Sequence, residues 1–325
     1  MLIRTVCILG GTGFVGRTLA NRLTRDGIRI RILTRDREKH KDDLILLPTV
    51  DLIQADVYDP HQLQKYFCNC DAVINLVGIL NEKGRDGKGF HKAHVELTEK
   101  TIDACQKKSV KRLLHMSALN ADPGAQSHYL QTRGMAEKLV LEADSQSMRT
   151  TVFRPSVIFG REDSFFNRFA TLLKLTPVFF PLACAHTRFA PVFVGDVAET
   201  FTLALTDSGT FGKKLDLCGP ARYTLQELVE FTANCTGTRR KIIPLNDFLS
   251  RMQAMIFDYI PGKPFSTDNY LSARVDSVCA GENHLHQFVS HPGTIEAIVP
   301  GYLANRFERA RYYQFRRQIH GHQAD

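Results

Sequence analysis

The chain is 325 residues long but has no apolar run of the length that a membrane-spanning helix needs. It also has no secretory signal before its first strand-like stretch, which runs from Leu2 to Leu9 and leads straight into a glycine-rich turn. A transit peptide would have to be missing or already removed. These absences lead us to expect a cytoplasmic protein, with peripheral attachment at the inner membrane as the alternative.

Metal-binding spacing is missing from the cysteines. Cys68 and Cys70 are one residue apart, and no second Cys or His pair lies at the spacing of a zinc site. The other six are scattered, at Cys7, Cys105, Cys184, Cys218, Cys235 and Cys279. We therefore expect no metal centre, and we expect the cysteines to be reduced, mostly buried thiols of a reducing compartment.

Signatures of nucleic-acid binding are absent as well. The formal net charge of +8 would suit nucleic acid, an anionic membrane surface or an anionic ligand. Because no zinc finger, RNA-recognition motif or basic zipper accompanies this charge, we expect no nucleic-acid partner. The densest basic group lies at 302–320, where arginines are interleaved with aromatic residues. This pattern predicts a basic helix that contacts an anionic membrane or a partner complex, or that docks on the protein itself.

What the sequence does contain is a regular alternation of short apolar strands with amphipathic stretches in its first half. The expected strands are 2–9, 28–33, 50–54, 71–77, 111–116 and 150–154. The clearest helical patterns lie at 14–25, 91–107 and 129–143. Such alternation predicts an α/β fold. Right-handed connections between parallel strands favour a Rossmann doubly wound parallel sheet with helices on both faces.

The pattern changes after the sixth expected strand. We expect residues 1–155 to form a dinucleotide-binding Rossmann domain and 156–325 a smaller substrate-side region, with a crossing back to the sheet near 191–206. Within the second region, Thr224 and Glu227 have the spacing of a capping box and so predict the start of a helix.

The most informative motif lies between the first strand and the first helix, in the sequence Val-Cys-Ile-Leu-Gly-Gly-Thr-Gly-Phe-Val-Gly that ends at Gly16. Gly11, Gly13 and Gly16 satisfy the pattern G-x-G-x-x-G. Glycines allow a tight turn and a close approach of backbone to a pyrophosphate, and the N-terminus of the following helix attracts that anion. The residues expected to hold a nicotinamide dinucleotide here are Gly10, Gly11, Thr12, Gly13, Phe14, Val15 and Gly16.

The end of the second strand indicates which nicotinamide cofactor is bound. NAD-binding units place an acid there, which accepts hydrogen bonds from the ribose 2′-hydroxyl. Here the strand ends on Thr34 and Arg35, and Asp36 comes one or two residues late. A guanidinium at Arg35 suits the 2′-phosphate of NADP. We therefore favour NADP, with NAD as the alternative in which Asp36 reaches back to the hydroxyl.

Further motifs follow the strands in order. They are Ala-Asp-Val at 55–57, Asn-Leu-Val-Gly at 75–78, Met-Ser-Ala at 116–118 and Arg-Pro at 154–155. With the glycine turn, they resemble extended and atypical short-chain dehydrogenases/reductases of the NAD-dependent epimerase/dehydratase type. Three stretches, at 90–96, 191–198 and 265–269, narrow the match. They are similar to the subfamily of the nucleotide-binding accessory subunit of mitochondrial complex I and its bacterial relatives.

This resemblance implies where the rest of the cofactor lies. The residues that would line it beyond the glycine turn are Asp56, Val57, Leu76, Val77, Gly78 and Pro155. The first two would lie by the adenine and the next three by the ribose. The backbone that follows Arg154 and Pro155 would approach the nicotinamide.

The superfamily's catalytic residues are a serine, a tyrosine and a lysine, with the last two spaced four residues apart on one helical face. Ser117 and Tyr129 fit these positions, but Arg133 stands where the lysine is expected. Arginine keeps the positive charge, yet its planar fork is not equivalent to an ammonium group. We assign Ser117, Tyr129 and Arg133 as candidate catalytic residues, with Arg133 also at the cofactor, and expect weak turnover or none.

Two other features have both a structural and a functional interpretation. His94, in the helix after the fourth strand, is expected to be structural, with a place in the cofactor cleft as the alternative. Five aromatic residues are expected to pack in the core, with an apolar pocket for a quinone-like or lipid-like molecule as the alternative. They are Phe165, Phe166, Phe169, Phe179 and Phe180.

Two functions remain open at this point. The first is a cofactor-binding protein with weak or no turnover, acting as an accessory factor of a respiratory or quinone-handling complex. The second is an active NADPH-dependent reductase, or a sugar-nucleotide-type epimerase or dehydratase. The intact Ser117 and Tyr129 favour the second, and Arg133 favours the first.

Overall fold

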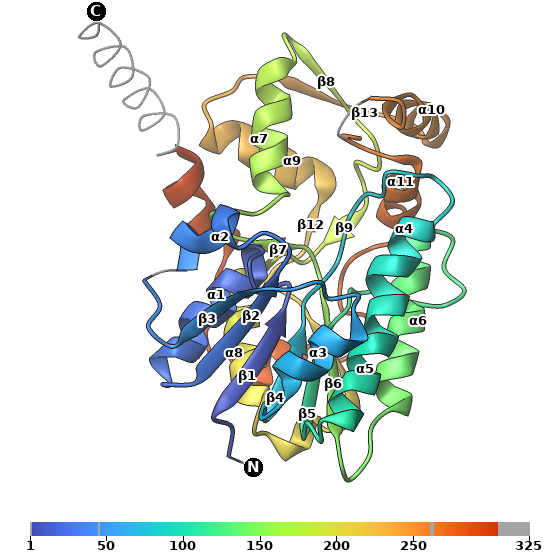
Figure 1. The fold of residues 1–325 in the computed structure, drawn as a ribbon. Helices are drawn as coiled ribbons and strands as arrows, with labels where there is room; N and C mark the ends of the chain where they lie inside the picture. The colour runs from blue at the N-terminus through green and yellow to red at the C-terminus, as the bar shows by residue number, and fades with distance from the viewer. Residues whose placement is uncertain (1, 45, 261–262, 305–325) are drawn as a thin grey trace, which may run out of the picture.

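The computed structural model describes residues 2–44, 46–260 and 263–304 (Figure 1). At its centre is a seven-stranded sheet with the order β11-β6-β5-β4-β1-β2-β3, in which all neighbouring strands are parallel. The strands are β1 (Thr5–Leu9), β2 (Arg29–Thr34), β3 (Val50–Gln54), β4 (Ala72–Asn75), β5 (Arg112–Met116), β6 (Arg149–Pro155) and β11 (Lys213–Leu217). The strand order reverses between β1 and β4, so the predicted Rossmann doubly wound sheet is confirmed.

Helices cover both faces of this sheet (Figure 1). They are α1 (Phe14–Arg25), α2 (Arg37–Leu44), α3 (Pro60–Phe67), α4 (Lys88–His91), a π-helical turn (Lys92–Glu96), α5 (Leu97–Lys107), α6 (His128–Glu142) and α8 (Val194–Ala204). On one face Leu19 of α1 and Phe201 of α8 pack with Ile8 of β1. On the other, Phe67 of α3 packs in a cluster with Val73 of β4. Burial on both faces explains why the strands are almost continuously apolar.

A smaller layer lies beyond the carboxyl ends of the strands (Figure 1). Its short strands pair as β7 (Ile158–Phe159) with β10 (Val192–Phe193), β9 (Arg188–Phe189) with β12 (Tyr223–Thr224), and β8 (Phe179–Leu182) with β13 (Lys241–Pro244). Its helices are α7 (Phe166–Leu175), α9 (Leu225–Cys235), α10 (Asp247–Phe257) and α11 (Thr267–Ala273). Short 3₁₀ helices lie at Ser208–Thr210 and His284–Gln287. Thr224 and Glu227 form the predicted capping box at the start of α9.

The six predicted strands are all present, with shifted ends. The first begins at Thr5, because Thr5 is the first residue of β1 to pair with β2. The helix predicted at 91–107 begins earlier, at Lys88, and contains the π-helical turn. The chain rejoins the sheet through β10 and α8 and then as β11, which pairs with β6. The division of the chain at residue 155 stays a prediction.

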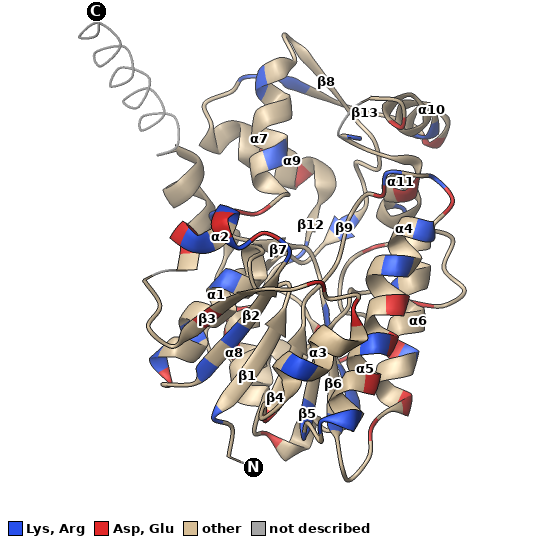
Figure 2. Ribbon diagram, in the orientation of Figure 1, with Lys and Arg blue, Asp and Glu red and all other residues tan. Residues whose placement is uncertain are grey.

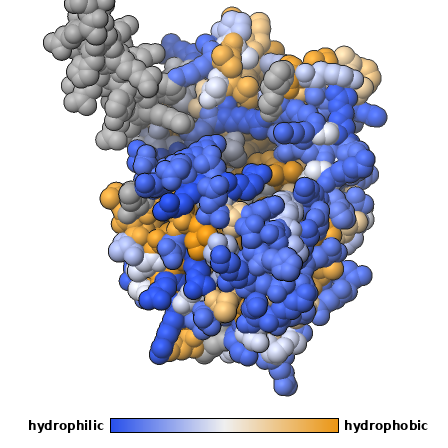
Figure 3. Space-filling view, in the orientation of Figure 1, coloured by the Kyte–Doolittle hydropathy of each residue, from blue (hydrophilic) through white to orange (hydrophobic). Residues whose placement is uncertain are grey.

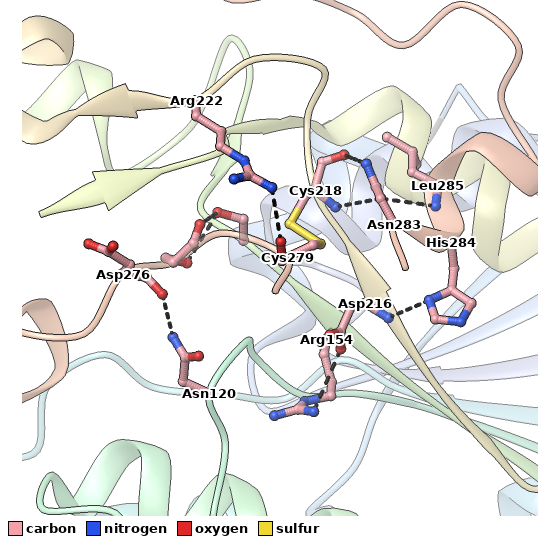
Figure 4. The surroundings of a disulfide bond; sticks show 12 residues. Asn120, Arg154, Asp216, Cys218, Arg222, Asp276, Cys279, Asn283, His284 and Leu285 are labelled. Carbon is pink, nitrogen blue, oxygen red and sulfur yellow. Dashed lines mark hydrogen bonds and ion pairs between the residues drawn. A yellow bond between two sulfur atoms is a disulfide. The ribbon is translucent and has the colours of Figure 1, made fainter. Parts of the chain in front are cut away.

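One expectation about the cysteines is wrong. Cys218 and Cys279 form a disulfide with a Cα–Cα distance of 6.0 Å, although they are 61 residues apart in the sequence (Figure 4). Cys218 directly follows β11, and the Asn283 amide accepts its N–H and donates to its carbonyl. Only the tertiary structure brings the two thiols together, so their spacing gave no sign of the pair. The other six cysteines are free, and three of them are buried.

The chain beyond α11 continues past the 3₁₀ turn into a helical segment at 295–304. The basic helix predicted at 302–320 lies, beyond residue 304, outside the described residues. None of the helices in the described ranges combines the length and the apolar character that spanning a bilayer would require.

Candidate functional site

The glycine-rich turn joins the carboxyl end of β1 to the N-terminus of α1. Gly10 has a φ of +77°, in the left-handed region that favours glycine, and its carbonyl accepts the N–H of Gly13 over 3.1 Å. A Cβ on Gly16 would lie 2.5 Å from the same carbonyl oxygen, so α1 packs on the turn only with glycine there. On Gly13 the nearest atom to such a Cβ would be that oxygen, at 3.3 Å. The fold therefore requires Gly16 but tolerates a side chain at Gly13.

The N-terminus of α1 receives no negative charge from its own first turn. Gly13 is the N-cap and has no side chain to accept a helix N–H, and the first turn contains no acidic residue. The unpaired N–H groups and the positive end of the helix dipole are therefore available to an external anion.

At the carboxyl end of β2, Arg35 and Asp36 have different surroundings. The Asp36 carboxylate accepts the N–H of Lys39 over 3.0 Å and so belongs to the start of α2. Arg35 is exposed, and no carboxylate in the described part of the chain lies within ion-pair distance of its guanidinium. Of the two, Arg35 is the group that a ligand phosphate would find unpaired.

The ends of β3 and β4 lie at the same edge of the sheet. The Asp56 carboxylate accepts the N–H of Tyr58 over 2.9 Å and stays exposed, while Val57 is buried. The backbone of Leu76 lies against Gly10, with its carbonyl carbon 3.1 Å from where a Cβ on Gly10 would stand. The fold thus brings the residues expected along the cofactor from three strand ends to one edge.

Arg133 reaches from α6 to the ends of β4 and β5. Its Nη1 donates to the carbonyl of Met116 over 2.7 Å and to that of Val77 over 3.2 Å. A Cβ on Gly78 would lie 1.8 Å from Nη2, so the guanidinium occupies space that only a glycine leaves open. Arg133 is only 4% exposed. Its Nη1 is taken up by these two carbonyls, while its buried Nε has no hydrogen-bond partner among the described residues.

Ser117, just after β5, is held by a carboxylate of α6. Its hydroxyl donates to Glu137 over 2.6 Å, and Nε of Arg154 lies 3.3 Å from the same oxygen. Arg154 also approaches Asp216 of β11, at 3.6 Å (Figure 4). Burial raises the pKa of Glu137, and the Ser117 hydrogen bond and the Arg154 charge oppose that rise. The predicted serine is therefore engaged inside the protein.

Sequence reasoning missed Glu137, although a signal was there. Glu137 lies four residues after Arg133 and eight after Tyr129, the spacing of side chains on one helical face. The face of α6 that carries the candidate tyrosine and arginine therefore also carries the carboxylate that binds Ser117.

Tyr129 lies in the first turn of α6 among other aromatic rings. Its ring centroid is 6.1 Å from that of Phe90 and 5.7 Å from that of His94, in edge-on arrangements. It is half-buried, and within the described residues its hydroxyl makes no hydrogen bond. In the described part of the chain, the Tyr129 hydroxyl is thus free of protein partners, as is the buried Nε of Arg133.

His94 is buried in the π-helical turn. Its Nε2 accepts the N–H of Ile79 over 3.3 Å, and its Nδ1 lies 2.8 Å from Oγ1 of Thr132. Burial lowers the pKa of His94 and the nearby Arg133 charge lowers it further, so the ring is neutral. With Nε2 accepting, Nδ1 carries the proton and donates to Thr132. These contacts support the structural interpretation of His94.

The stretch at 265–269 holds the N-terminus of α6. The Asp268 carboxylate accepts the N–H of His128 over 2.6 Å and that of Tyr129 over 3.2 Å. Asn269 donates its side-chain amide to the carbonyl of Leu80, in the loop after β4. One motif therefore fixes both the helix that carries Tyr129 and the loop beside it.

Four of the five phenylalanines contact one another and the buried apolar residues around them. Phe165 lies with its ring centroid 5.2 Å from those of both Phe166 and Phe169, and Phe169 approaches Phe180. Phe166 and Phe180 are buried, whereas Phe179 is exposed. These contacts support core packing over a ligand pocket for most of the cluster.

A glycine turn at the switch point of a doubly wound parallel sheet defines the Rossmann class of dinucleotide-binding folds. The NAD dependent epimerase/dehydratase family matches residues 6–215 of the chain. The chain belongs to this family, whose cofactor is a nicotinamide dinucleotide.

The relatives include subunits of a respiratory complex. The chain is 30% identical over 263 residues to mitochondrial NADH dehydrogenase (ubiquinone) 1 alpha subcomplex subunit 9 of Mus musculus, covering 80% of this chain and 68% of that protein. It is 29% identical over 240 residues to the mitochondrial NADH-ubiquinone oxidoreductase 40 kDa subunit of Neurospora crassa, covering 73% of this chain. The match spans 61% of the Neurospora protein, less than two thirds of its length. The predicted resemblance to such accessory subunits is confirmed.

Solved structures share the fold at lower identity. The structure titled MoeE5 in complex with UDP-glucuronic acid and NAD has a TM-score of 0.71 and 17% identity to this chain. It covers 94% of this chain and 99% of its own. Likeness at this identity supports the Rossmann fold, including the layer beyond the strand ends.

Proposed function

We propose that this protein binds NADPH in preference to NADH, turns it over slowly or not at all, and acts as an accessory factor of a respiratory or quinone-handling complex. The observation that carries the proposal is the placement of Arg133. In active relatives of this class a lysine holds the nicotinamide ribose and lowers the pKa of the tyrosine. Here Nη1 of the arginine donates hydrogen bonds to the carbonyls of Val77 and Met116 instead.

The residues at the glycine turn fit a dinucleotide. The exposed glycine at the uncapped N-terminus of α1 suits a pyrophosphate, and Arg35, without an ion-pair partner in the described chain, suits a 2′-phosphate. Asp56 and Val57 would border the adenine, while Leu76, Val77, Gly78 and Pro155 would border the rest of the cofactor. When bound, its nicotinamide would supply or accept a hydride.

On the α6 side of the candidate site, two of the side chains needed for proton transfer are held by other parts of the protein. Ser117 donates its hydroxyl to Glu137, so it is not free to orient a substrate oxygen. Arg133 lies beside the Tyr129 ring, with its guanidinium carbon 5.6 Å from the ring centroid, but its hydrogen bonds point to backbone. Tyr129 therefore lacks both of the partners that make a tyrosine an efficient acid or base.

The role in a complex rests on the relatives. The mouse and Neurospora proteins are by name subunits of NADH dehydrogenase and NADH-ubiquinone oxidoreductase. We infer a partner complex of the same kind, a cytoplasmic location at the inner membrane, and contact with the complex or the membrane through the predicted basic helix of the tail.

The test is to separate binding from turnover. NADPH and NADH are titrated into the protein by calorimetry, and the NADPH complex is then mixed with aldehydes, ketones and short-chain quinones while NADPH absorbance is followed. We expect tighter binding of NADPH and negligible oxidation. Oxidation near the roughly 10 per second that is typical of enzymes would contradict the proposal.

A second function, an active NADPH-dependent reductase or a sugar-nucleotide-type epimerase or dehydratase, is favoured by one observation. The Tyr129 hydroxyl is present, half-buried and without a protein partner, as a proton donor to substrate would be. If rapid oxidation is seen and Tyr129→Phe abolishes it, this second function is the correct one.

A further inference from the structure

Helix α10 turns its large apolar residues away from the protein. The side that packs inward buries two small residues, Ser250 at 2% exposure and Ala254 at 0%. The opposite side exposes Phe248 at 70% and Ile256 at 57%. We define the α10 surface as the exposed residues Phe248, Leu249, Met252, Met255, Ile256, Tyr259 and Ile260. A surface helix normally buries its large apolar side chains against the protein core. The reversed pattern of α10 therefore indicates that its exposed face contacts an apolar surface outside the protein.

The apolar character continues onto the neighbouring strands. Gln253 of α10 donates to the carbonyl of Pro181 in β8, which fixes the helix beside that strand. Three more large apolar residues are exposed there: Phe179 of β8, Ile243 of β13, and Val178 just before β8. Figure 3 shows orange atoms along the upper end of the molecule, where Figure 1 places β8 and α10. Contiguous exposed patches of this kind mark interaction sites.

Basic residues border the patch. Arg239, Lys241 and Arg251 are exposed, and within the described ranges no carboxylate lies at ion-pair distance from any of them. Figure 2 shows blue segments at this end of the molecule, next to β8. At the other border the guanidinium of Arg85 lies 4.0 Å from the ring centroid of Tyr259. The apolar face is thus accompanied by unpaired positive charge and an aromatic ring.

We propose that the α10 surface docks on a lipid bilayer that contains anionic lipids, with α10 lying in the plane of the interface. Phe, Leu, Ile and Met side chains on one helical face enter the acyl boundary, while arginine and lysine extend to the phosphates. This chemistry favours lipid over a protein partner, because the apolar residues stand on one outward-facing helix rather than lining a groove, and the unpaired charge is of one sign. The proposal depends neither on the cofactor nor on the residues beyond 304.

Docking there would orient the candidate site toward the membrane. Tyr270 of α11 donates its hydroxyl to Asp247 at the start of α10 over 2.6 Å. Asp268 of the same helix α11 accepts the N–H groups of His128 and Tyr129. Figure 1 shows α11 between α10 and the helices that carry the candidate site. The lipid-facing helix is therefore joined to Tyr129 through one short helix.

The experiment uses the full chain and sedimentation with vesicles of phosphatidylcholine alone or mixed with phosphatidylglycerol. Wild type is expected to bind the mixed vesicles and to be released by salt. The triple variant F248D/M252D/I256D is expected to bind at least about tenfold more weakly, because each charge opposes burial of an apolar side chain at the interface. The triple variant R239Q/K241Q/R251Q is expected to lose the preference for phosphatidylglycerol.

A matched control places the same charges on other exposed apolar residues, in L2D/L46D/L203D, and should bind as wild type. Circular dichroism and NADPH affinity confirm that each variant is folded. Absence of wild-type binding to either vesicle, or unchanged binding by F248D/M252D/I256D, overturns the proposal. The second result would assign any membrane binding to another part of the chain. A dimer that F248D/M252D/I256D converts to monomer, without vesicle binding by wild type, would assign the surface to a second copy.

Discussion

The glycine turn and the α6 side of the candidate site differ in where the protein leaves its polar groups without partners. At the glycine turn the helix N-terminus is uncapped, and Arg35 is unpaired. On the face of α6, Arg133 and Glu137 bind backbone carbonyls and the Ser117 hydroxyl. On the α6 side the groups that lack partners within the described residues, Nε of Arg133 and the ring nitrogens of His115, are buried, whereas Arg35 is exposed to a ligand. The comparison indicates that the glycine turn keeps accessible groups for a ligand, while the α6 side holds its polar side chains inside the protein.

The largest effect is expected from Gly13→Val, which attacks the binding end. The nearest protein atom to a Cβ there is 3.3 Å away, so the variant should fold, but its side chain would fill the space of the pyrophosphate. We expect cofactor affinity to fall at least about 100-fold in calorimetry, since charge-assisted bonds are worth about 1.5–3 kcal/mol each. Gly16→Val is the contrast, because its Cβ would collide with Gly10 and disturb the fold itself. Unchanged affinity in a folded Gly13→Val protein would refute the binding site.

Arg35→Ala tests cofactor choice at the same end. NADPH binding should weaken by roughly 1.5–3 kcal/mol, the scale of a charge-assisted hydrogen bond, while NADH binding stays nearly constant. Arg37→Ala serves as the matched control, because Arg37 donates its Nε to the carbonyl of Leu52. Equal losses for both cofactors in Arg35→Ala would show that Arg35 does not contact the 2′-phosphate.

His115 of β5 tests whether the α6 side is a dry internal layer. Neither ring nitrogen has a hydrogen-bond partner among the described residues, and burial, with the Arg133 charge, lowers the pKa of His115 to about 3. Below about pH 6.5 the His115 ring is protonated in the unfolded chain but stays neutral in the folded protein. The free energy of unfolding therefore decreases as the pH falls from about 6.5 toward 3. Replacing the ring by His115→Leu should reduce the slope of unfolding free energy against pH by about 1.4 kcal/mol per pH unit.

Urea unfolding between pH 4 and pH 6 measures this slope, and pH 8 gives the reference in which both states hold a neutral ring. A slope equal to that of wild type would mean that water or a ligand reaches His115 in the folded protein. The α6 side would then be a wet site, and the comparison of the two ends would fail.

The smallest effect is expected from Arg133→Lys. Restoring the lysine leaves Ser117 bonded to Glu137, so single-turnover NADPH oxidation should change less than about twofold. Adding Glu137→Leu removes the acceptor of the Ser117 hydroxyl and should raise turnover above that of Arg133→Lys alone. A rise toward roughly 10 per second in Arg133→Lys alone would show that the arginine by itself limits the chemistry.

Local patterns predicted most of the fold and the position of the glycine turn. Strand alternation and the spacing of Gly11, Gly13 and Gly16 depend on neighbours in sequence, and the structure has the corresponding sheet and turn. The capping box at Thr224 is local for the same reason. What local patterns could not give is contact across the chain. Asp268 lies far from Tyr129 in the sequence, and its bonds to the start of α6 exist only in the folded protein.

The motif of the candidate catalytic residues also did not show their hydrogen-bond partners, because these lie far away in the sequence. The pattern identified Arg133 as an unusual residue. It did not identify the two carbonyls that accept hydrogen bonds from its Nη1. The same limit applies to the disulfide, because sequence spacing does not show that the end of β11 meets the segment around Cys279. The reversed face of α10 is a third case, since its apolar pattern alone would predict burial against the core.

The Cys218–Cys279 disulfide makes a covalent ring of the chain between its ends. The ring contains α9, α10 and α11 and closes a sequence separation of 61 residues, which in chain-entropy terms is worth about 4 kcal/mol. The ring closes at the end of β11, where Asp216 approaches Arg154. Arg154 in turn holds Glu137. The three helices of the ring are thus covalently tied to the edge of the central sheet at both ends of their segment.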